Sequence, residues 1–431
     1  MNVAVIGLWH LGSVVAVCAA SVGHKVAAWD PDAAVVAGLN EGRPPVAEPG
    51  VASLARAGLD SGSLHFVSDR RIAVQNAEIV WITFDTPVDD EDQADVGKVV
   101  EEVIDLYSDL TDGSLVVVSS QLPVGTVARL EAAWQRVAGA RHVTFACVPE
   151  NLRLGKAIDV FTNPDRIVAG IRRDADRRRI EELFAPVTTR IEWMSVESAE
   201  MTKHAINAFL ATSVTFINEL AALCETCGAD AKEIERGLKS ERRIGPSAYL
   251  SPGAAFAGGT LARDVMALKS LGARVGRQTP LLNGVEASNR EHRHWARRQL
   301  MNQLGTLAGA RIAIWGLTYK PGTDTLRRST SIELCRWLLD EGASVSVHDP
   351  QAKSLPEQLN RVVRHDSPVA AAQSASALVV ATEWPEYRAV EADELASAMP
   401  SGIVVDANRF LAPILDHDPR FHIIAVGQVP R

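Results

Sequence analysis

The sequence contains few cysteines, and their placement argues against a disulfide-stapled fold. It has 5 cysteines in 431 residues, scattered through apolar or helix-like segments. We therefore expect reduced thiols in the core rather than disulfides. Cys224-x-x-Cys227 has the spacing of a redox or metal-binding pair, but it falls within a helical pattern and no second pair accompanies it. No metal site is expected.

The sequence also lacks a basic cluster and long apolar runs. The net charge is -9 and lysine and arginine do not cluster, which argues against nucleic acid or an anionic membrane as the main partner. No uncharged apolar run approaches the roughly 18 residues of a transmembrane helix. The chain opens directly on the strand-like run Asn2–Ile6, without the features of a signal peptide. We expect a cytoplasmic protein.

Length and periodicity predict three parts. A chain of 431 residues is too long for one ordinary core, so two or three domains are expected. Residues 1–195 and 304–431 alternate β-branched runs with helical stretches, which is typical of βαβ units around a parallel sheet. Residues 196–303 show helical periodicity alone. The predicted fold class is α/β, with two doubly wound, Rossmann-like domains joined by a helical connector that also pairs subunits.

The apolar runs give the expected elements. The first sheet is predicted to contain strands 3–6, 25–29, 79–83, 114–118 and 144–147, and the second strands 310–315, 344–347, 377–381 and 402–405. Long helical periodicity covers 201–225 and 265–298, and a further helix is expected at 331–341.

The first predicted strand ends in a glycine-containing turn. Gly7-Leu8-Trp9-His10-Leu11-Gly12 opens an Ala/Val-rich helix, and Asp30 closes the second predicted strand. A carboxylate there accepts both hydroxyls of an adenosine ribose, which favours NAD over NADP. Trp9, however, occupies the position where the GxGxxG fingerprint needs glycine so that the backbone can touch the pyrophosphate. Either the indole swings aside, the cofactor binds differently, or the domain has lost its dinucleotide.

Many short motifs follow one another along the chain in a characteristic order. They are Leu39-Asn40-Glu41-Gly42, Glu48-Pro49-Gly50, Phe84-Asp85-Thr86-Pro87, Pro149-Glu150-Asn151-Leu152, Asn163-Pro164-Asp165-Arg166, Lys203-x-x-x-Asn207-Ala208-Phe209, Arg243-Ile244-Gly245-Pro246, Gly258-Gly259-Thr260 with Asp264, Gly316-Leu317-Thr318-Tyr319-Lys320, and Thr382-Glu383-Trp384. Each is weak alone. Together they resemble the family of UDP-glucose, UDP-N-acetylmannosamine and GDP-mannose dehydrogenases across nearly the whole chain.

The resemblance implies a catalytic set. In that family the C6 alcohol of a nucleotide sugar loses a hydride to NAD, a cysteine captures the aldehyde, and a second hydride transfer leads to the uronic acid. Lys203 and Asn207 match the residues that stabilise the oxyanion and position water, and their spacing puts both on one helix face. Asp264 matches a base or water orienter, and Glu150 a residue that helps activate water. A solvated lysine, a helix N-terminal charge and a surface carboxylate remain alternative interpretations.

The resemblance also implies binding residues. Arg243 matches an arginine that reaches a neighbouring subunit's substrate, so a homodimer is expected, although a simple phosphate contact or salt bridge is an alternative. The implied cofactor-binding residues are Gly7, Trp9, Leu11, Gly12, Asp30, Thr86 and Arg327, and the implied substrate-binding residues are Arg243, Tyr249, Gly258 and Lys320. The expected partner is a nucleotide-sugar substrate.

Departures from the family pattern concern the second oxidation. Thr260 stands where the family has its nucleophilic cysteine, and a hydroxyl cannot ionise usefully where a thiol with a pKa of about 8.5 can. Gln121, Leu154 and Arg263 replace a threonine, a second glutamate and a lysine. These changes put the second oxidation in doubt.

Three hypotheses follow from the sequence. The first is an NAD-dependent nucleotide-sugar dehydrogenase that stops at the aldehyde or proceeds through its hydrate. The second is a redox-neutral, epimerase-like enzyme that retains NAD. The third is a non-catalytic nucleotide-sugar-binding protein, which would produce no NADH.

Overall fold

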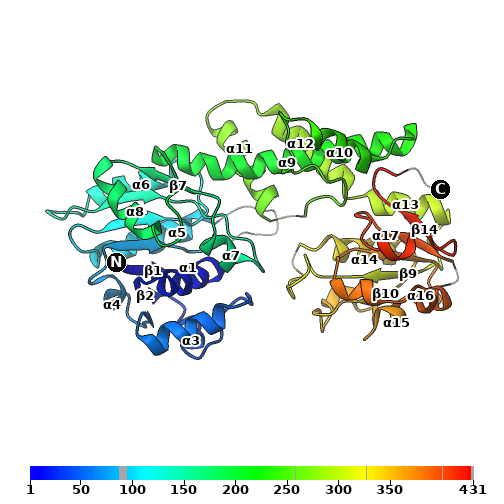
Figure 1. The fold of residues 1–431 in the computed structure, drawn as a ribbon, viewed down its shortest axis with the longest axis horizontal. Coiled ribbons are helices and arrows are strands. Elements are labelled where there is room, and N and C mark those ends of the chain that lie inside the picture. Colours follow the sequence, from blue (N-terminus) through cyan, green and yellow to red (C-terminus); the bar gives the residue numbers. More distant parts are fainter. Residues whose placement is uncertain (87–94, 258, 327, 400, 429–431) are drawn as a thin grey trace. The chain divides into compact units, whose positions relative to one another are not determined.

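The computed structural model describes residues 1–86, 95–257, 259–326, 328–399 and 401–428. The chain divides into two compact units, Met1–Ile206 and Asn207–Arg431 (Figure 1). A single long helix, α9 (Val196–Cys227), begins in the first unit and ends in the second.

The first unit is built on one sheet with the strand order β3-β2-β1-β4-β5-β6-β7-β8 among its described residues. The strands are β1 (Asn2–Ile6), β2 (Lys25–Trp29), β3 (Leu64–Phe66), β4 (Ile79–Ile82), β5 (Leu115–Val118), β6 (Thr144–Cys147), β7 (Ile167–Ile171) and β8 (Ile191–Met194). The helices are α1 (His10–Ser21), α2 (Ala33–Asn40), α3 (Val51–Ser61), α4 (Arg70–Val74), α5 (Val96–Asp105), α6 (Thr126–Gln135), α7 (Ala157–Thr162) and α8 (Arg177–Phe184).

Hydrophobic side chains of the central strands fill a core on each face of this sheet. Every residue of β4 and β5 is buried, as expected for strands covered by helices on both sides. The core on one face includes α1, α3 and α8, and the core on the other includes α5, α6 and the start of α9. β1, β4, β5 and β6 run parallel. The loops that follow them therefore all leave the sheet at the same edge.

The sheet is not parallel throughout. β1 to β6 run parallel, but β7 pairs antiparallel with β6, with Ala146 opposite Ile171, and β8 runs parallel to β7. The sequence predicted a parallel sheet and did not mark β3, β7 or β8. β3 has three residues and β8 is only partly buried, so neither has the long apolar run by which a buried strand is recognised.

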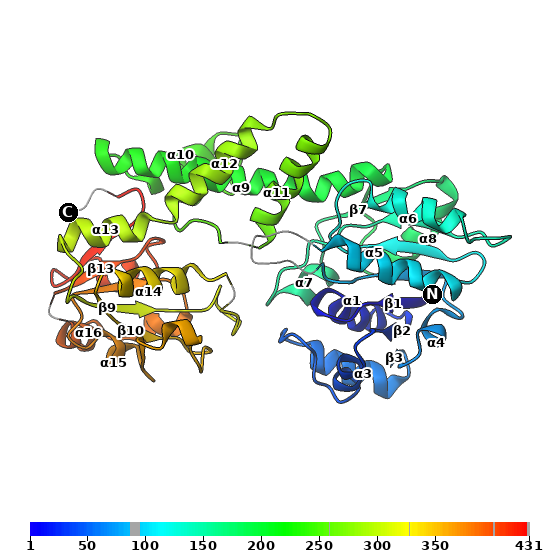
Figure 2. The same cartoon turned by 180° about the vertical axis from the view of Figure 1, so that it is seen from behind.

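The second unit contains a smaller sheet, with the strand order β11-β10-β9-β12-β13-β14 among its described residues. Its strands are β9 (Arg311–Trp315), β10 (Ser344–His348), β11 (Val363–Arg364), β12 (Ala377–Val380), β13 (Ile403–Val405) and β14 (His422–Ile424), and all its pairings are parallel. The associated helices are α14 (Thr330–Asp340), α15 (Pro368–Ala372), α16 (Ala392–Ala398) and α17 (Ala412–Leu415). α14 covers one face, and α15 and α16 cover the other (Figures 1 and 2).

The predicted helical stretch 265–298 is three helices rather than one. They are α11 (Thr260–Arg274), α12 (Pro280–His292) and α13 (Trp295–Leu304), and α10 (Ala231–Ser240) precedes them. Gly276 adopts φ 67° just after α11, and Pro280 is the first residue of α12, a position that suits proline because the missing N–H is not needed there. Apolar side chains of α9, α11 and α12 form a small core of their own.

Among the described residues, α9 alone has the length and composition of a helix that could cross a membrane. Half of its most apolar window is buried within the protein. It also carries buried polar side chains, including Asn207, Thr215 and Asn218, which is typical of a core helix whose polar groups find partners. The predicted fold class is confirmed: two Rossmann-like sheets and a helical connector.

Candidate active site

The turn after β1 is shaped by two glycines. Gly7 has φ 93°, and a Cβ there would meet the backbone of Phe84 at 2.8 Å. A Cβ on Gly12, in the first turn of α1, would lie 1.6 Å from the carbonyl oxygen of Gly7. The strand, the turn and the helix can approach this closely only without side chains at both positions.

Asp30 lies directly after β2, beside this turn. Its carboxylate accepts hydrogen bonds from the backbone N–H groups of Leu8 at 2.6 Å and Asp32 at 2.8 Å. Each carboxylate oxygen has two lone pairs, so the group can still accept further donors. This placement fits the ribose of a dinucleotide.

The remaining predicted cofactor residues of the first unit take different positions. Trp9 precedes α1 and is 49% exposed, whereas Leu11 is buried in the core. The buried hydroxyl of Thr86 donates to the carbonyl oxygen of Gln121 at 2.7 Å, so it ties the loop after β4 to the loop after β5. Leu11 therefore contributes packing beneath the turn rather than a polar contact.

Glu48 links the cofactor turn to the segment that follows Glu150. Its buried carboxylate lies 2.9 Å from His10 Nε2 and accepts the N–H groups of Gly155 at 2.7 Å and Ala157 at 2.9 Å. Glu48 belongs to one of the family motifs, but the sequence predicted no role for it. The carboxylate thus joins the side chain of His10, the first residue of α1, to the first N–H group of α7.

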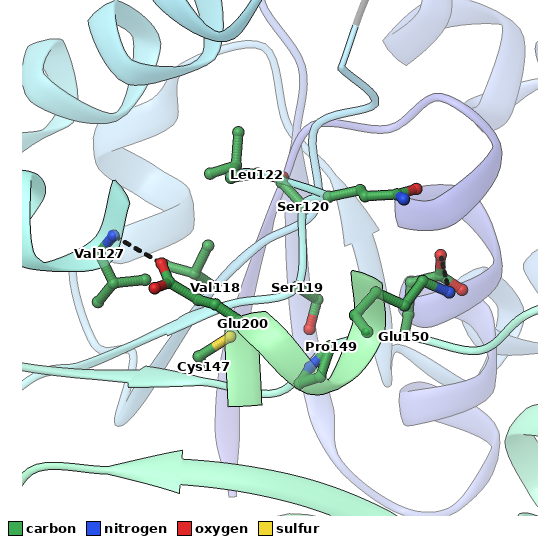
Figure 3. A pocket seen from close by; sticks show the side chains of 11 residues that line it. Val118, Ser119, Ser120, Leu122, Val127, Cys147, Pro149, Glu150 and Glu200 are labelled. Carbon is green, nitrogen blue, oxygen red and sulfur yellow. Dashed lines mark hydrogen bonds and ion pairs between the residues drawn. The ribbon is translucent and has the colours of Figure 1, made fainter. Parts of the chain in front are cut away.

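A small cavity, with about 10 Å³ of free space, lies beside Lys203 in the first unit. Figure 3 shows residues that line it. Its polar lining comes from Ser119, Ser120, Gln121, Glu150, Glu200 and Lys203. Lys203 is only 8% exposed, and its Nζ lies 3.8 Å from Glu150 Oε1. That separation is longer than a hydrogen bond, so the two groups form an ion pair without bonding each other directly. The structure thus brings Lys203 and Glu150 together.

Glu200 anchors the start of α6 on this cavity. It accepts the N–H group of Gly125 at 2.7 Å and that of Val127 at 2.9 Å. Figure 3 shows the bond to Val127. Burial raises the pKa of this carboxyl, and the two backbone hydrogen bonds oppose the rise. Sequence reasoning missed Glu200; a carboxylate three residues before Lys203 on the same helix was the available signal.

The cysteines show no activated thiol near this cavity. All five are free, and four are buried. Cys147 lines the cavity, but burial, with a smaller contribution from Glu200, raises the pKa of its thiol. Burial likewise raises the pKa of Cys18 and Cys335 to about 12. A thiolate nucleophile needs the opposite environment, with a lowered pKa and access to substrate.

In the second unit, Asn207 and Asp264 form a pair. Asn207, on α9, donates from Nδ2 to a carboxylate oxygen of Asp264, on α11, and both side chains are buried. Thr260 is the first residue of α11 and is exposed, one helical turn before Asp264. Gly259 precedes it with φ 110°, a conformation that favours glycine. The turn therefore presents the Thr260 hydroxyl at a helix N-terminus.

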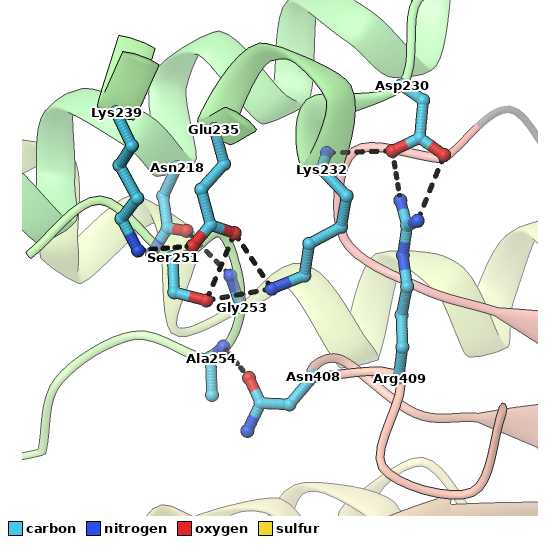
Figure 4. Close-up of polar contacts among 10 residues, drawn as sticks. All are labelled: Asn218, Asp230, Lys232, Glu235, Lys239, Ser251, Gly253, Ala254, Asn408 and Arg409. Atoms are coloured by element: carbon cyan, nitrogen blue, oxygen red, sulfur yellow. Dashed lines mark hydrogen bonds and ion pairs between the residues drawn. The ribbon is translucent and has the colours of Figure 1, made fainter. Parts of the chain in front are cut away.

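The segment that leads to Thr260 is held by side chains from three elements. Asn218 accepts the N–H of Gly253 at 3.0 Å, and His292 bonds the carbonyl oxygen of Gly253 at 2.8 Å. Asn289 binds both the N–H and the carbonyl oxygen of Phe256, at 3.0 and 2.8 Å. Asn408, after β13, accepts the N–H of Ala254 (Figure 4). These contacts fix the backbone before the Thr260 turn.

Ion pairs extend this support toward the second sheet. Arg409 binds Asp230 through two contacts, at 2.8 and 2.9 Å, and Glu235 binds both Lys232 and Lys239 (Figure 4). Asp230 also begins α10 by accepting the N–H of Lys232. Bidentate arginine–carboxylate pairs are directional, so α10 has a defined position against the loop after β13.

The predicted substrate residues are spread over the second unit. The Arg243 side chain is 88% exposed, and Tyr249 is also exposed, so both are accessible on the 241–250 segment. Lys320, in the loop after β9, is partly buried. Gly258 and Arg327 lie outside the described residues.

A second cavity, of about 80 Å³, lies at the carboxyl ends of β12 and β13. α12, α13 and the start of α14 enclose it, and His292, Arg293, Arg297, Ser331 and Asn408 contribute polar groups to its lining. Burial lowers the pKa of His292, which favours the neutral ring. Small-molecule sites of open α/β sheets form at such strand ends.

Comparison with known proteins decides the family. Residues 1–188 match the NAD binding domain of the UDP-glucose/GDP-mannose dehydrogenase family, residues 197–291 its central domain, and residues 313–413 its UDP binding domain. The chain belongs to the UDP-glucose/GDP-mannose dehydrogenase family.

Relatives in this family match along almost the whole chain. UDP-glucose 6-dehydrogenase of Pseudomonas aeruginosa is 34% identical over 96% of this chain and 94% of its own length. UDP-glucose 6-dehydrogenase of Rhizobium meliloti is 35% identical over 94% of each. A solved UDP-glucose dehydrogenase from Pyrobaculum islandicum superposes with a TM-score of 0.85 at 31% identity, covering 94% of this chain and 93% of that one.

Membership of the UDP-glucose/GDP-mannose dehydrogenase family confirms the predicted enzyme class and cofactor. The protein is an NAD-dependent oxidoreductase that acts on a CH–OH group of a nucleotide sugar. The turn geometry fits NAD, because Gly7 and Gly12 have no room for side chains and Asp30 retains free lone pairs beside them.

Proposed function

We propose that this enzyme oxidises the C6 alcohol of a UDP-linked hexose, with UDP-glucose as the first candidate. The similarity to UDP-glucose 6-dehydrogenases over nearly the full chain supports this choice of substrate. The proposed catalytic residues are Lys203, Asn207, Asp264, Glu150 and Thr260. We propose the division 1–195, 196–303 and 304–431 for the cofactor, connector and nucleotide-sugar domains.

The observation that carries this proposal is the position of Lys203. A lysine that is 8% exposed, with a carboxylate 3.8 Å from its Nζ, is poorly explained as a solvated surface residue. In the proposed reaction its ammonium stabilises the negative charge that develops on the C6 oxygen, and Asn207, one turn further along α9, assists. Glu150, which lies 3.8 Å from Lys203 Nζ, is the proposed acceptor of the C6 hydroxyl proton.

The chain's other residues orient the reactants. NAD, when bound, accepts the hydride from C6. Gly7, Trp9, Leu11, Gly12, Asp30, Thr86 and Arg327 are the proposed cofactor-binding residues. We propose Lys320, Gly258, Tyr249 and a partner subunit's Arg243 for the substrate, and the cavity at the ends of β12 and β13 for part of its nucleotide.

The missing cysteine limits the second half of the reaction. The described hydrogen bonds give Thr260 no base that would ionise its hydroxyl. Cys147, the thiol that lines the cavity beside Lys203, is buried and its pKa is raised. We therefore propose that no thioester forms. Any acid must arise through the hydrated aldehyde.

We also propose that the protein is a cytoplasmic homodimer without a membrane or nucleic-acid partner. Phe209, Phe216 and Leu223 repeat every seven residues along α9 and are 71%, 47% and 63% exposed. Such a stripe follows one helix face, and a second copy could cover it. Light scattering of Phe216→Glu should then show a monomer at concentrations where the unmodified protein is a dimer.

The decisive experiment incubates the protein with NAD and a panel of nucleotide sugars, and measures product mass and NADH. We expect NADH and a C6 aldehyde or acid from a UDP-hexose, and a loss of at least about a hundredfold in Lys203→Ala, a typical cost of removing an oxyanion-stabilising group. An epimer without NADH would indicate the redox-neutral reaction. Binding without turnover for every sugar would overturn the proposal.

A companion variant tests the role of Thr260. Thr260→Cys should raise acid formation relative to aldehyde, because it supplies a thiol that can be tuned toward ionisation. Thiol alkylation should leave the unmodified enzyme active and inactivate only this variant. Loss of activity in the unmodified enzyme would mean that another cysteine is the nucleophile.

A further inference from the structure

The cavity beside Lys203 contains a polar group that the described protein residues leave unused. Ser120 is 7% exposed, and its hydroxyl has no hydrogen-bond partner among the described residues. The neighbouring Ser119 differs, because its hydroxyl accepts from Trp81 Nε1 at 2.8 Å and donates to the carbonyl oxygen of Val148. Buried hydroxyls are nearly always paired, so an unpaired one on a cavity wall indicates a bound water or ligand.

The size and lining of the cavity favour water. Its free space admits about one water molecule, which is the least that a buried water requires. Ser120, Glu150 and Lys203 line the same cavity, and Figure 3 labels Ser120 and Glu150. Lys203 Nζ and Glu150 Oε1 lie 3.8 Å apart, too far for a direct hydrogen bond. The walls of this cavity offer a water three kinds of partner, a hydroxyl, a carboxylate and an ammonium group, and a buried water usually bonds two to four groups.

We propose that this cavity is a water site and that Ser120 holds the water that hydrates the C6 aldehyde. This inference rests on the proposed function. A second hydride transfer needs a tetrahedral C6 that carries a hydroxyl group and a hydrogen. Without a cysteine to add to the aldehyde, hydration forms this tetrahedral C6.

The step balances on the residues present. The water oxygen bonds to C6 while the C=O π bond breaks; one water proton passes to Glu150, and the aldehyde oxygen receives a proton from Lys203. The product is the C6 gem-diol, and proton transfer from Glu150 back to Lys203 restores both groups. Oxidation of the diol by NAD then releases a proton and gives the acid and NADH. Ser120 positions the water and does not itself exchange protons with the substrate.

The test separates hydration from hydride transfer. The C6 aldehyde of the UDP-sugar is offered with NAD, which requires water, and separately with NADH, which reduces it to the alcohol without water. We expect Ser120→Ala to slow aldehyde oxidation at least about tenfold, as loss of positioning does, and to leave aldehyde reduction within about twofold. A high-resolution crystal structure should show one water at Ser120 Oγ that is absent in the variant.

Thr126→Val is the matched control. Its hydroxyl is buried in the same unit but is already bonded to the carbonyl oxygen of Pro123 at 2.6 Å, so both directions should be unchanged. Three outcomes would each overturn the water site. Ser120→Ala could slow aldehyde oxidation and aldehyde reduction equally, or it could slow neither. The third outcome is an unmodified enzyme that reduces the aldehyde but never oxidises it. If the unmodified enzyme acts on neither alcohol nor aldehyde, the proposed function itself fails, and the density at Ser120 alone decides whether a water binds.

Discussion

The turn after β1 and the turn after β9 begin alike and then differ. Gly7 and Gly316 both have φ 93°, and their N–H groups bond Trp29 and His348, the last residues of β2 and β10. In each case the next N–H bonds an aspartate, Leu8 to Asp30 at 2.6 Å and Leu317 to Asp349 at 2.7 Å. The turn after the first strand of each sheet therefore has the same backbone geometry.

The two aspartates are used differently. Asp30 accepts two backbone N–H groups and is partly exposed. Asp349 is 1% exposed, and its carboxylate accepts from the backbone of Leu317, Thr318, Gln351 and Ala352, the hydroxyl of Thr318 and Trp384 Nε1. A saturated carboxylate holds a turn together, whereas one with free lone pairs can bind ribose.

The helices after the turns differ as well. α1 starts at His10, immediately behind the first turn, whereas α14 starts only at Thr330. A helix N-terminus next to a turn favours a diphosphate, and the second turn instead carries a loop with Lys320. Two sheets whose first six strands follow the same order thus offer different ligand surfaces.

Gly12→Ala should break the first turn most severely. The added Cβ would lie 1.6 Å from Gly7 O, so α1 must move. We expect the free energy of unfolding to fall by about 3 kcal/mol and NAD affinity to fall more than about a hundredfold, measured by urea unfolding and calorimetry. Gly97→Ala in α5 is the control, because its Cβ meets Asp95 at an ordinary 3.5 Å; it should be neutral or slightly stabilising. Normal NAD binding by Gly12→Ala would refute the argument.

Asp349→Asn should weaken the second unit and spare the cofactor. An amide in place of the carboxylate turns an NH₂ group toward N–H donors, which costs about 2–4 kcal/mol of unfolding free energy. NAD affinity should change less than about twofold. If the variant unfolds normally but binds NAD poorly, the two aspartates have been assigned the wrong roles.

The same residue predicts a dependence on pH. Burial favours the neutral form of Asp349, but the hydrogen bonds from Leu317, Thr318, Ala352 and Gln351 outweigh it and lower the pKa. Because the folded pKa lies below the unfolded value of about 3.9, the stabilisation is present above that pH and is lost as pH falls through the folded pKa. The stability gap between the unmodified protein and Asp349→Asn should therefore narrow below about pH 4 in urea unfolding; a constant gap would contradict this.

Asp30→Asn should weaken NAD binding more than it lowers stability. Stability should change by less than about 1 kcal/mol, since the carboxylate is partly exposed. NAD affinity should fall about tenfold, which is about 1.4 kcal/mol, and the preference over NADP should shrink because the repulsion of a 2′-phosphate is gone. Calorimetric titration with both cofactors measures this.

Trp9→Gly should have the smallest effect. Trp9 is half-exposed at the first turn, and its removal restores the glycine that lets the backbone approach the pyrophosphate. We expect NAD affinity to rise about threefold, equivalent to somewhat less than 1 kcal/mol. Tyr319→Ala in the second turn should leave NAD affinity unchanged. A loss of affinity in Trp9→Gly would mean that the indole contributes a contact to the cofactor.

Local sequence signals predicted much of the fold. The apolar runs of β4, β5 and β12 are buried on both faces, and such strands can be recognised without tertiary information. The reversed direction of β7 could not be recognised, because strand direction depends on the path of the chain between partners. Gly276 and Pro280 signal the break between α11 and α12. No glycine or proline lies between α12 and α13, so periodicity alone predicts one continuous helix there.

The candidate site was predicted less completely. Sequence motifs indicated Lys203 and Glu150, which the structure places together, and Asn207 and Asp264, which form a hydrogen bond. Their supporting residues Glu48, Glu200 and Asn289 were not assigned, because each acts on backbone groups remote in sequence.

The sequence by itself determined the family, the alternation of strands and helices, and the replacement of the nucleophilic cysteine by Thr260, since these depend on residue identity and order. Only the tertiary structure decided that Cys147 is too buried to replace that cysteine, that Asp30 and Asp349 differ in hydrogen bonding, and that Ser120 faces a cavity without a partner. Burial and hydrogen-bond saturation arise from segments far apart in the chain, so no local pattern could reveal them.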